Sequence, residues 1–145
     1  MEENPSPKSL SGVSVLLIED DLALLSGLIA QLTAEGAEVS AAADGRVGLA
    51  RFMSGQPDIV VTDIVMPERE GLETIMAIKS ARPDVPILAI SGGGRIGAPP
   101  FLDLARRLGA DDVLAKPFRT AQLVERIAAL VSPVSGVMPA TTARR

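Results

Sequence analysis

The chain has 145 residues, the length of one ordinary domain, and its composition is 47% hydrophobic but only 2% aromatic, so aliphatic side chains must fill the core. The absence of cysteine and histidine excludes disulfides, thiolate metal sites, thiol catalysis, a Ser-His-Asp triad and a histidine phosphodonor. The net charge is −4 and the sequence has neither a basic cluster nor an apolar run of membrane-spanning length, so we expect a cytoplasmic protein without direct nucleic-acid binding or membrane insertion.

Apolar runs alternate with helical patterns from the N-terminus onward. Strands are predicted at 13–18, around 39, at 59–62, at 85–90 and at 112–115. Helices are predicted at 21–36, 44–53, 72–79, 100–108 and 120–130. We expect residues 1–11 and 132–145 to form flexible arms around a single domain at 12–131. Five successive strand–helix units predict an α/β fold, a doubly wound five-stranded parallel sheet with helices on both faces.

Two of the predicted strands end in acids. Glu19, Asp20 and Asp21 follow the first strand, and Asp63 follows the third. A lysine, Lys116, follows the last strand. The carboxyl ends of parallel strands share one crevice, which is where open α/β sheets bind their ligands. We therefore expect these charged groups to converge there.

Five features of the sequence carry a resemblance: the strings VLLIEDD, VTDIVMP, LAISGG and LAKPF, and a glycine at Gly71. In combination, over about 13–131, they resemble the receiver domain of two-component response regulators. The resemblance implies the flavodoxin-like strand order 2-1-3-4-5 and a phosphoryl group accepted from a histidine kinase by Asp63. It implies a Mg²⁺ ion held by Glu19, Asp20, Asp63 and the backbone carbonyl of Val65. Ser91 and Lys116 would contact the phosphoryl oxygens, and the Lys116–Pro117 bond would be cis.

The charges of the residues themselves support a metal at this place. Two carboxylates about 4 Å apart repel each other by about 4 kcal/mol at an effective dielectric constant of 20, so three acids together favour a cation. Mg²⁺ suits them because it takes hard oxygen ligands from one or two carboxylates and from phosphate. The sequence therefore predicts Mg²⁺ as the cofactor, with no enzymatic activity beyond self-phosphorylation and autodephosphorylation.

Two features depart from the family pattern. Val113 stands on the fifth strand where many receivers carry an aromatic residue, and we hypothesise that rearrangement of the glycine-rich loop 91–100 replaces that switch. Only a short tail follows residue 131, so we expect a stand-alone regulator. Its partners would be a sensor histidine kinase, a histidine phosphotransfer protein, and a protein target of unknown identity. A phosphoryl relay or a sink without a dedicated target fits the sequence equally well.

Less specific interpretations exist for several residues. Asp21 is most simply a helix N-cap, the first helix is expected to bury Leu22 along with its other leucines, and the methionines are expected to fill the core. A haloacid-dehalogenase-type phosphatase would need a second acid where Val65 stands. A flavodoxin-like electron carrier would not place three acids in its phosphate-binding loop. The strongest alternative is a scaffold that keeps the receiver fold and acts without phosphorylation.

Overall fold

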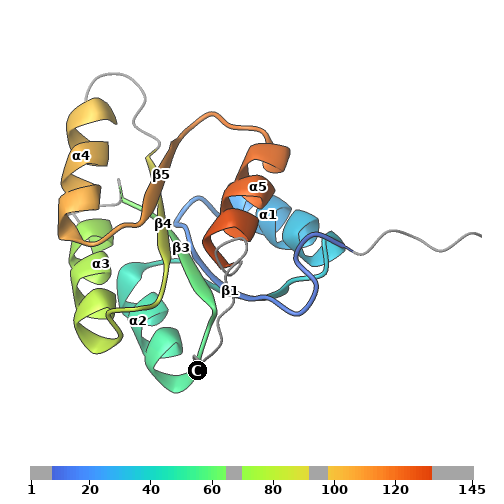
Figure 1. Cartoon of the computed structure of the whole chain (residues 1–145), viewed down its shortest axis with the longest axis horizontal. Helices are drawn as coiled ribbons and strands as arrows, with labels where there is room; N and C mark the ends of the chain where they lie inside the picture. The colour runs from blue at the N-terminus through green and yellow to red at the C-terminus, as the bar shows by residue number, and fades with distance from the viewer. Residues whose placement is uncertain (1–7, 65–69, 92–97, 132–145) are drawn as a thin grey trace, which may run out of the picture.

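The computed structural model describes residues 8–64, 70–91 and 98–131 (Figure 1). The strands are β1 (Ser14–Ile18), β2 (Glu38–Ala42), β3 (Ile59–Asp63), β4 (Ile87–Ser91) and β5 (Asp112–Ala115). The helices are α1 (Leu22–Ala34), α2 (Gly45–Ser54), α3 (Glu70–Ala81), α4 (Ala98–Leu108) and α5 (Thr120–Val131). All ten predicted elements are present, and most of their ends differ from the prediction by one or two residues. In the part of the chain that is described, no helix is long and apolar enough to cross a membrane.

The strands form one parallel sheet in the order β2-β1-β3-β4-β5. Helices α1 and α5 cover one face, and α2, α3 and α4 cover the other (Figure 1). This confirms the predicted doubly wound α/β fold and its strand order. Because every strand runs the same way, the carboxyl ends of β1, β3, β4 and β5 lie along one edge of the sheet.

Each face of the sheet has its own aliphatic core, because side chains alternate between the faces along a strand. On β1, Val15 and Leu17 pack beneath α1 and α5, whereas Leu16 and Ile18 pack beneath α2 and α3. The three central strands, β1, β3 and β4, are buried on both faces, which explains why they read as continuous apolar runs in the sequence, whereas the edge strands β2 and β5 are only partly buried. The aliphatic composition is therefore used on two sides of one sheet.

The structure confirms the predicted helix start at Asp21, whose carboxylate accepts a hydrogen bond from the Leu24 amide at 3.1 Å. The expectation that Leu22 is buried is wrong, because its side chain is 65% exposed. Leu22 is the first residue of α1 and lies at the margin of the buried stripe, beyond its centre at Leu25, Leu28 and Leu32.

The expected role of the methionines is also wrong for the two that the structure describes. Met53 is 63% exposed and Met76 is 49% exposed. On α3 the buried side chains Leu72, Ile75 and Ile78 define the face toward the sheet, and Met76 lies at the margin of this face, about 100° around the helix from its centre at Ile75. The hydrophobicity of a methionine did not decide its place, because the helix had enough aliphatic residues to cover the sheet.

The described part of the chain begins before residue 12, the expected start of the domain. Leu10 is fully buried against the core beneath α1 and α5, and its amide donates to the carbonyl of Glu35 at 2.9 Å. Lys8 donates from its ammonium group to the carbonyl of Ala34 at 3.1 Å. Residues 8–11, which we expected in the flexible arm, are thus attached to the end of α1. The expected tail, 132–145, lies outside the described residues.

Candidate functional site

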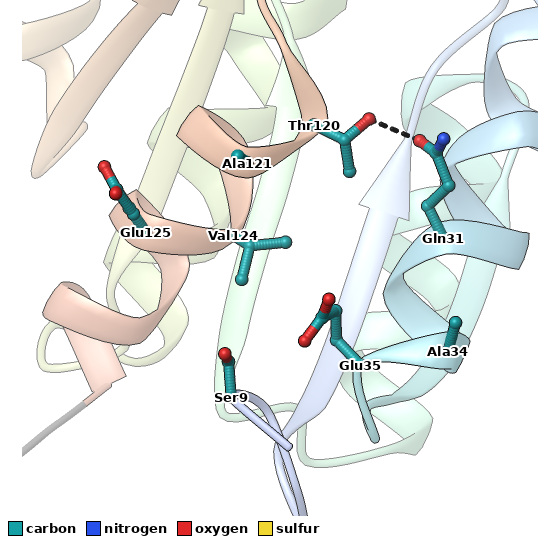
Figure 2. A pocket seen from close by; sticks show the side chains of 8 residues that line it. All are labelled: Ser9, Gln31, Ala34, Glu35, Thr120, Ala121, Val124 and Glu125. Carbon is teal, nitrogen blue, oxygen red and sulfur yellow. Dashed lines mark hydrogen bonds between the residues drawn. The ribbon is translucent and has the colours of Figure 1, made fainter. Parts of the chain in front are cut away.

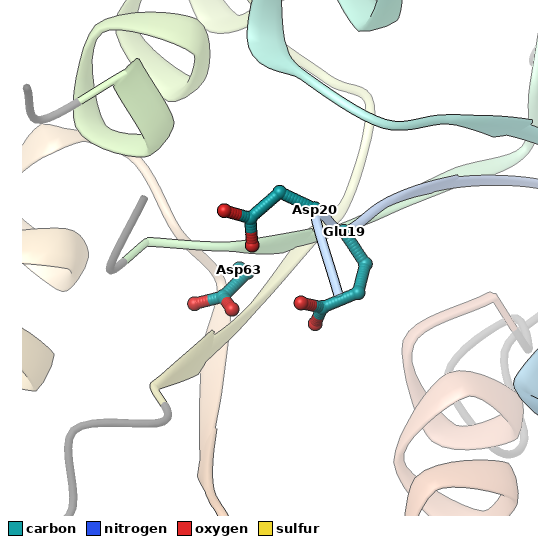
Figure 3. A group of neighbouring side chains, drawn as sticks. All are labelled: Glu19, Asp20 and Asp63. Carbon is teal, nitrogen blue, oxygen red and sulfur yellow. The ribbon is translucent and has the colours of Figure 1, made fainter. Parts of the chain in front are cut away.

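Three acids gather at the carboxyl edge of the sheet. Oxygen atoms of Glu19, Asp20 and Asp63 all lie within 4.8 Å of one another (Figure 3). Glu19 and Asp63 are almost completely buried, at 2% and 3% exposure, whereas Asp20 is exposed. The structure therefore brings together three of the side chains that the sequence predicted for a metal site.

Strand register explains why these acids meet. Ile18 of β1 stands opposite Thr62 of β3, so the next residue on each strand, Glu19 and Asp63, arrives at the same level of the sheet. The Glu19 amide continues the sheet by donating to the carbonyl of Ala42 at 3.0 Å. One carboxylate oxygen of Glu19 accepts from the Asp21 amide at 3.1 Å. Glu19 is thus fixed at both its backbone and its side chain.

Lys116 lies between the two buried carboxylates. Its ammonium nitrogen is 3.0 Å from Oε1 of Glu19 and 3.0 Å from Oδ2 of Asp63. The lysine follows β5 immediately, its amide donates to the carbonyl of Ser91 at 2.8 Å, and the expected cis peptide bond to Pro117 is present. The prediction that Lys116 reaches the acids is therefore supported by direct contacts.

Burial and neighbouring charges shift the pKa of Glu19 and the pKa of Lys116. Burial raises the pKa of Glu19, and the neighbouring charge of Asp63 raises it further, against the lowering effect of hydrogen bonds from Lys116 and the Asp21 amide. Burial alone would lower the pKa of Lys116, but its hydrogen bonds to Glu19 and Asp63 outweigh that effect and raise it. One ammonium group thus stays charged while facing two buried acids.

The donor set fits a hard divalent cation. It offers carboxylate oxygens only, from three residues, and one of these, Asp20, is exposed to solvent. Lys116 supplies a single positive charge against three acids, so negative charge is left over at this edge. Val65, whose carbonyl we expected as a further ligand, lies outside the described residues.

Ser91 ends β4 and is fully buried. It stands opposite Ala115 in the register of β4 and β5, one residue before Lys116. The serine and the lysine therefore reach the same edge from neighbouring strands, as predicted. The loop proposed to act as the switch lies mostly at 92–97, outside the described residues. Val113 is partly buried against the core beneath α3 and α4.

Gly71 packs directly against the acidic edge. A Cβ atom at this position would lie 2.3 Å from the carbonyl oxygen of Asp63 and 2.5 Å from Cα of Ile64. No side chain fits there without a shift of the backbone. The glycine thus allows the first turn of α3 to approach the end of β3.

Thr62, which precedes Asp63, was not predicted from the sequence as a residue of the site. Thr62 is fully buried, and its hydroxyl donates to the carbonyl of Asp63 at 3.1 Å. The signal in the sequence was a hydroxyl-bearing residue at the end of a strand otherwise made of Ile59, Val60 and Val61.

Two cavities lie beside α1 and α5 rather than among the acids. One, of about 440 Å³, lies between the second half of α1 and the first turns of α5, where Thr120 and Gln31 form a hydrogen bond (Figure 2). It contains none of the three clustered acids. The other, of about 340 Å³, lies between the first half of α1 and the segment 116–120, so that Lys116 lines it.

A parallel sheet in this order, with acids at the carboxyl ends of β1 and β3 and a lysine after β5, defines the receiver class of signalling domains. The chain belongs to the response regulator receiver domain family, whose model matches residues 15–128. The resemblance seen in the sequence strings is therefore confirmed at the level of the family.

Curated relatives support the same family assignment. The chain is 37% identical over 120 residues to the response regulator MprA of Mycolicibacterium vanbaalenii, an alignment that covers 82% of this chain and 50% of that protein. It is 36% identical over 124 residues to the transcriptional regulatory protein PrrA of Mycobacterium leprae, covering 84% of this chain and 51% of that one. The chain spans about half the length of the curated relatives it matches.

Solved structures agree with the fold. A response regulator receiver domain protein from Clostridium thermocellum superposes with a TM-score of 0.75 at 27% identity, covering 82% of this chain and 94% of that one. A CheY-like receiver domain protein from Methanospirillum hungatei superposes with a TM-score of 0.74 at 27% identity, covering 82% and 93%.

Proposed function

We propose that this receiver domain is a phosphorylation-dependent signalling protein in which Asp63 accepts a phosphoryl group with the help of Mg²⁺. The observation that carries the proposal is the convergence of Glu19, Asp20 and Asp63 with Lys116 at one edge of the sheet. Burying two carboxylates is unfavourable for folding alone, so a functional reason for their presence is needed. A scaffold that ignores phosphorylation would supply none.

Phosphoryl transfer to Asp63 requires little covalent chemistry from the rest of the protein. A carboxylate oxygen of Asp63 forms a bond to phosphorus, the bond from phosphorus to the donor's nitrogen or oxygen breaks, and the donor leaves with that electron pair. When bound, Mg²⁺ supplies positive charge that neutralises the phosphoryl oxygens. Lys116, which is 3.0 Å from Asp63, would pair with one of these oxygens, and the hydroxyl of Ser91 would pair with another.

The signal would leave through protein contacts. Phosphorylation adds close to two negative charges beside Ser91 and Lys116, which changes the forces on the ends of β4 and β5. We propose a sensor histidine kinase or a histidine phosphotransfer protein as the phosphodonor. We propose contact with a protein target as its output, and a relay or sink role uses the same chemistry.

Intact-mass spectrometry after incubation with acetyl phosphate tests the proposal. We expect a mass gain of one phosphoryl group that requires Mg²⁺ and disappears in Asp63→Ala. Asp58→Asn is the matched control, because Asp58 lies at the opposite end of β3, where its carboxylate accepts from the Ser14 amide. A wild-type protein that gains no mass and shows no response to beryllofluoride would replace the proposal with the scaffold alternative.

A further inference from the structure

Thr62 occupies a position on β3 at which a buried aliphatic side chain is expected. Thr62 is fully buried, and the residues before it on the strand are Ile59, Val60 and Val61. Valine has nearly the shape of threonine and would be buried without the cost of removing a hydroxyl from water. The hydroxyl of Thr62 therefore needs a compensating partner, which it finds in the carbonyl oxygen of Asp63 at 3.1 Å.

This hydrogen bond belongs to a group of contacts around a single peptide group, the one that joins Asp63 to Ile64. At one side of that peptide, the Ile64 amide donates to the carbonyl of Ile90 on β4 at 2.9 Å. At the other side, the Asp63 carbonyl accepts from the Thr62 hydroxyl and lies against Gly71, where a Cβ would come within 2.3 Å of it. The peptide is held at both its donor and its acceptor.

The alternation of the strand gives independent support for this geometry. Val60 faces the core beneath α2, α3 and α4, and two residues later Thr62 faces the same side. Gly71 belongs to α3, which covers that side of the sheet. The Asp63 carbonyl therefore turns toward the α3 face at the point where β3 ends, and the threonine and the glycine both lie on the side to which it turns.

We propose that Thr62 is a positioning residue for the phosphoacceptor: its buried hydroxyl fixes the Asp63–Ile64 peptide and so sets the direction in which the Asp63 carboxylate leaves the strand. The inference rests on the proposed function of Asp63. In this role Thr62 would act through the backbone of Asp63 and would not itself bind the metal or the phosphoryl group. Serine keeps this contact, whereas valine keeps the shape and loses it.

Two variants separate positioning from packing. Thr62→Val removes the hydroxyl and with it this hydrogen bond to the Asp63 carbonyl, so we expect Mg²⁺ affinity, measured by calorimetric titration, to fall about tenfold. The rate of phosphorylation by acetyl phosphate at a fixed Mg²⁺ concentration should fall with it. Thr62→Ser keeps the hydroxyl donor but loses a buried methyl group. This variant should therefore be less stable than wild type and yet bind Mg²⁺ within about twofold of the wild-type affinity.

A purely structural threonine predicts the reverse order, in which Thr62→Ser is impaired at least as much as Thr62→Val. That order, or a Mg²⁺ affinity of folded Thr62→Val within twofold of wild type, would overturn the inference.

Amide hydrogen exchange at Ile64 gives a readout that needs neither metal nor phosphate. We expect Thr62→Val to speed exchange at Ile64 and Thr62→Ser to leave it unchanged. If wild type gains no phosphoryl group and binds no Mg²⁺, the proposed function fails, and the exchange data still decide whether the peptide is held by Thr62. If wild type reacts and the exchange at Ile64 is the same in all three proteins, the positioning role alone fails.

Discussion

At the scale of single residues, the site is defined by an excess of buried negative charge. Glu19 and Asp63 are nearly inaccessible, and one lysine, Lys116, contacts both at 3.0 Å. An ammonium group can compensate one carboxylate fully, but not two together with the nearby Asp20. Without a further cation, the folded protein therefore carries an electrostatic strain that the unfolded chain, with its acids in water, does not.

Glu19 makes this strain measurable through pH. Its pKa is raised above the ordinary value of 4.5 by burial and by Asp63, so the folded protein holds a proton there at a pH where the unfolded chain has released it. The contribution of Glu19 to the free energy of unfolding therefore falls as pH rises from 4.5 through the raised pKa. Relative to Glu19→Gln, wild type should lose stability over this window.

Urea unfolding followed by circular dichroism, at several pH values and without Mg²⁺, measures this difference. Glu73→Gln, which changes an exposed glutamate of α3, controls for the substitution itself. A difference between wild type and Glu19→Gln that does not change with pH would contradict the expectation.

At the scale of elements, the approach of α3 to β3 depends on Gly71. A Cβ there would lie within 2.5 Å of backbone atoms of Asp63 and Ile64, which cannot move aside as a flexible side chain can. We expect Gly71→Ala to lower the free energy of unfolding by about 1–3 kcal/mol, because the helix must shift. Phosphorylation should slow as well, since the shift acts on the backbone of Asp63.

Gly27 offers the matched control in α1. A Cβ at this position would meet nothing within 4 Å. Gly27→Ala should therefore raise the free energy of unfolding by about 0.5–1 kcal/mol through reduced backbone freedom of the unfolded chain. If urea unfolding gives the same change in the free energy of unfolding for Gly71→Ala and Gly27→Ala, the close contact of α3 with β3 does not determine the effect of substitution at Gly71.

The elements of the fold and the position of the candidate site could be predicted from the sequence, because both depend on local sequence patterns. Alternating apolar runs and helical patterns placed the elements, and acids at strand ends placed the candidate site. Leu22, Met53 and Met76 were misplaced because hydrophobicity does not tell which side of a helix meets the sheet when more apolar residues exist than the sheet needs. The hydrogen bond of Thr62 depends on the direction of the Asp63 carbonyl at the end of β3, which only the folded backbone shows.

At the scale of the whole molecule, the edge of the sheet joins segments from widely separated parts of the chain. Glu19 and Lys116 are 97 residues apart in sequence and are brought into contact only when β1, β3 and β5 lie in one sheet. A ligand that binds this edge therefore binds the folded chain and not the unfolded one. Its binding energy adds to the stability of the whole domain.

Magnesium should accordingly stabilise the protein against heat. At a concentration one hundred times its Kd, a ligand specific for the folded state adds about 2.7 kcal/mol, which corresponds to a rise in Tm of roughly 5–10 °C for a domain of this size. Circular dichroism is the suitable probe, because the chain has no tyrosine or tryptophan. Relief of the repulsion among Glu19, Asp20 and Asp63 is the physical source of the gain.

Two adjacent aspartates sharpen this test. Asp20→Asn removes an exposed carboxylate from the acidic group, so the rise in Tm with Mg²⁺ should be lost or greatly reduced. Asp21→Asn makes the same change one residue later, where the side chain caps α1 through the Leu24 amide, and asparagine caps a helix equally well. The Asp21→Asn protein should keep the full response. If both variants keep it, Mg²⁺ binds elsewhere on the protein, and if both lose it, the response depends on the charge of the segment rather than on Asp20.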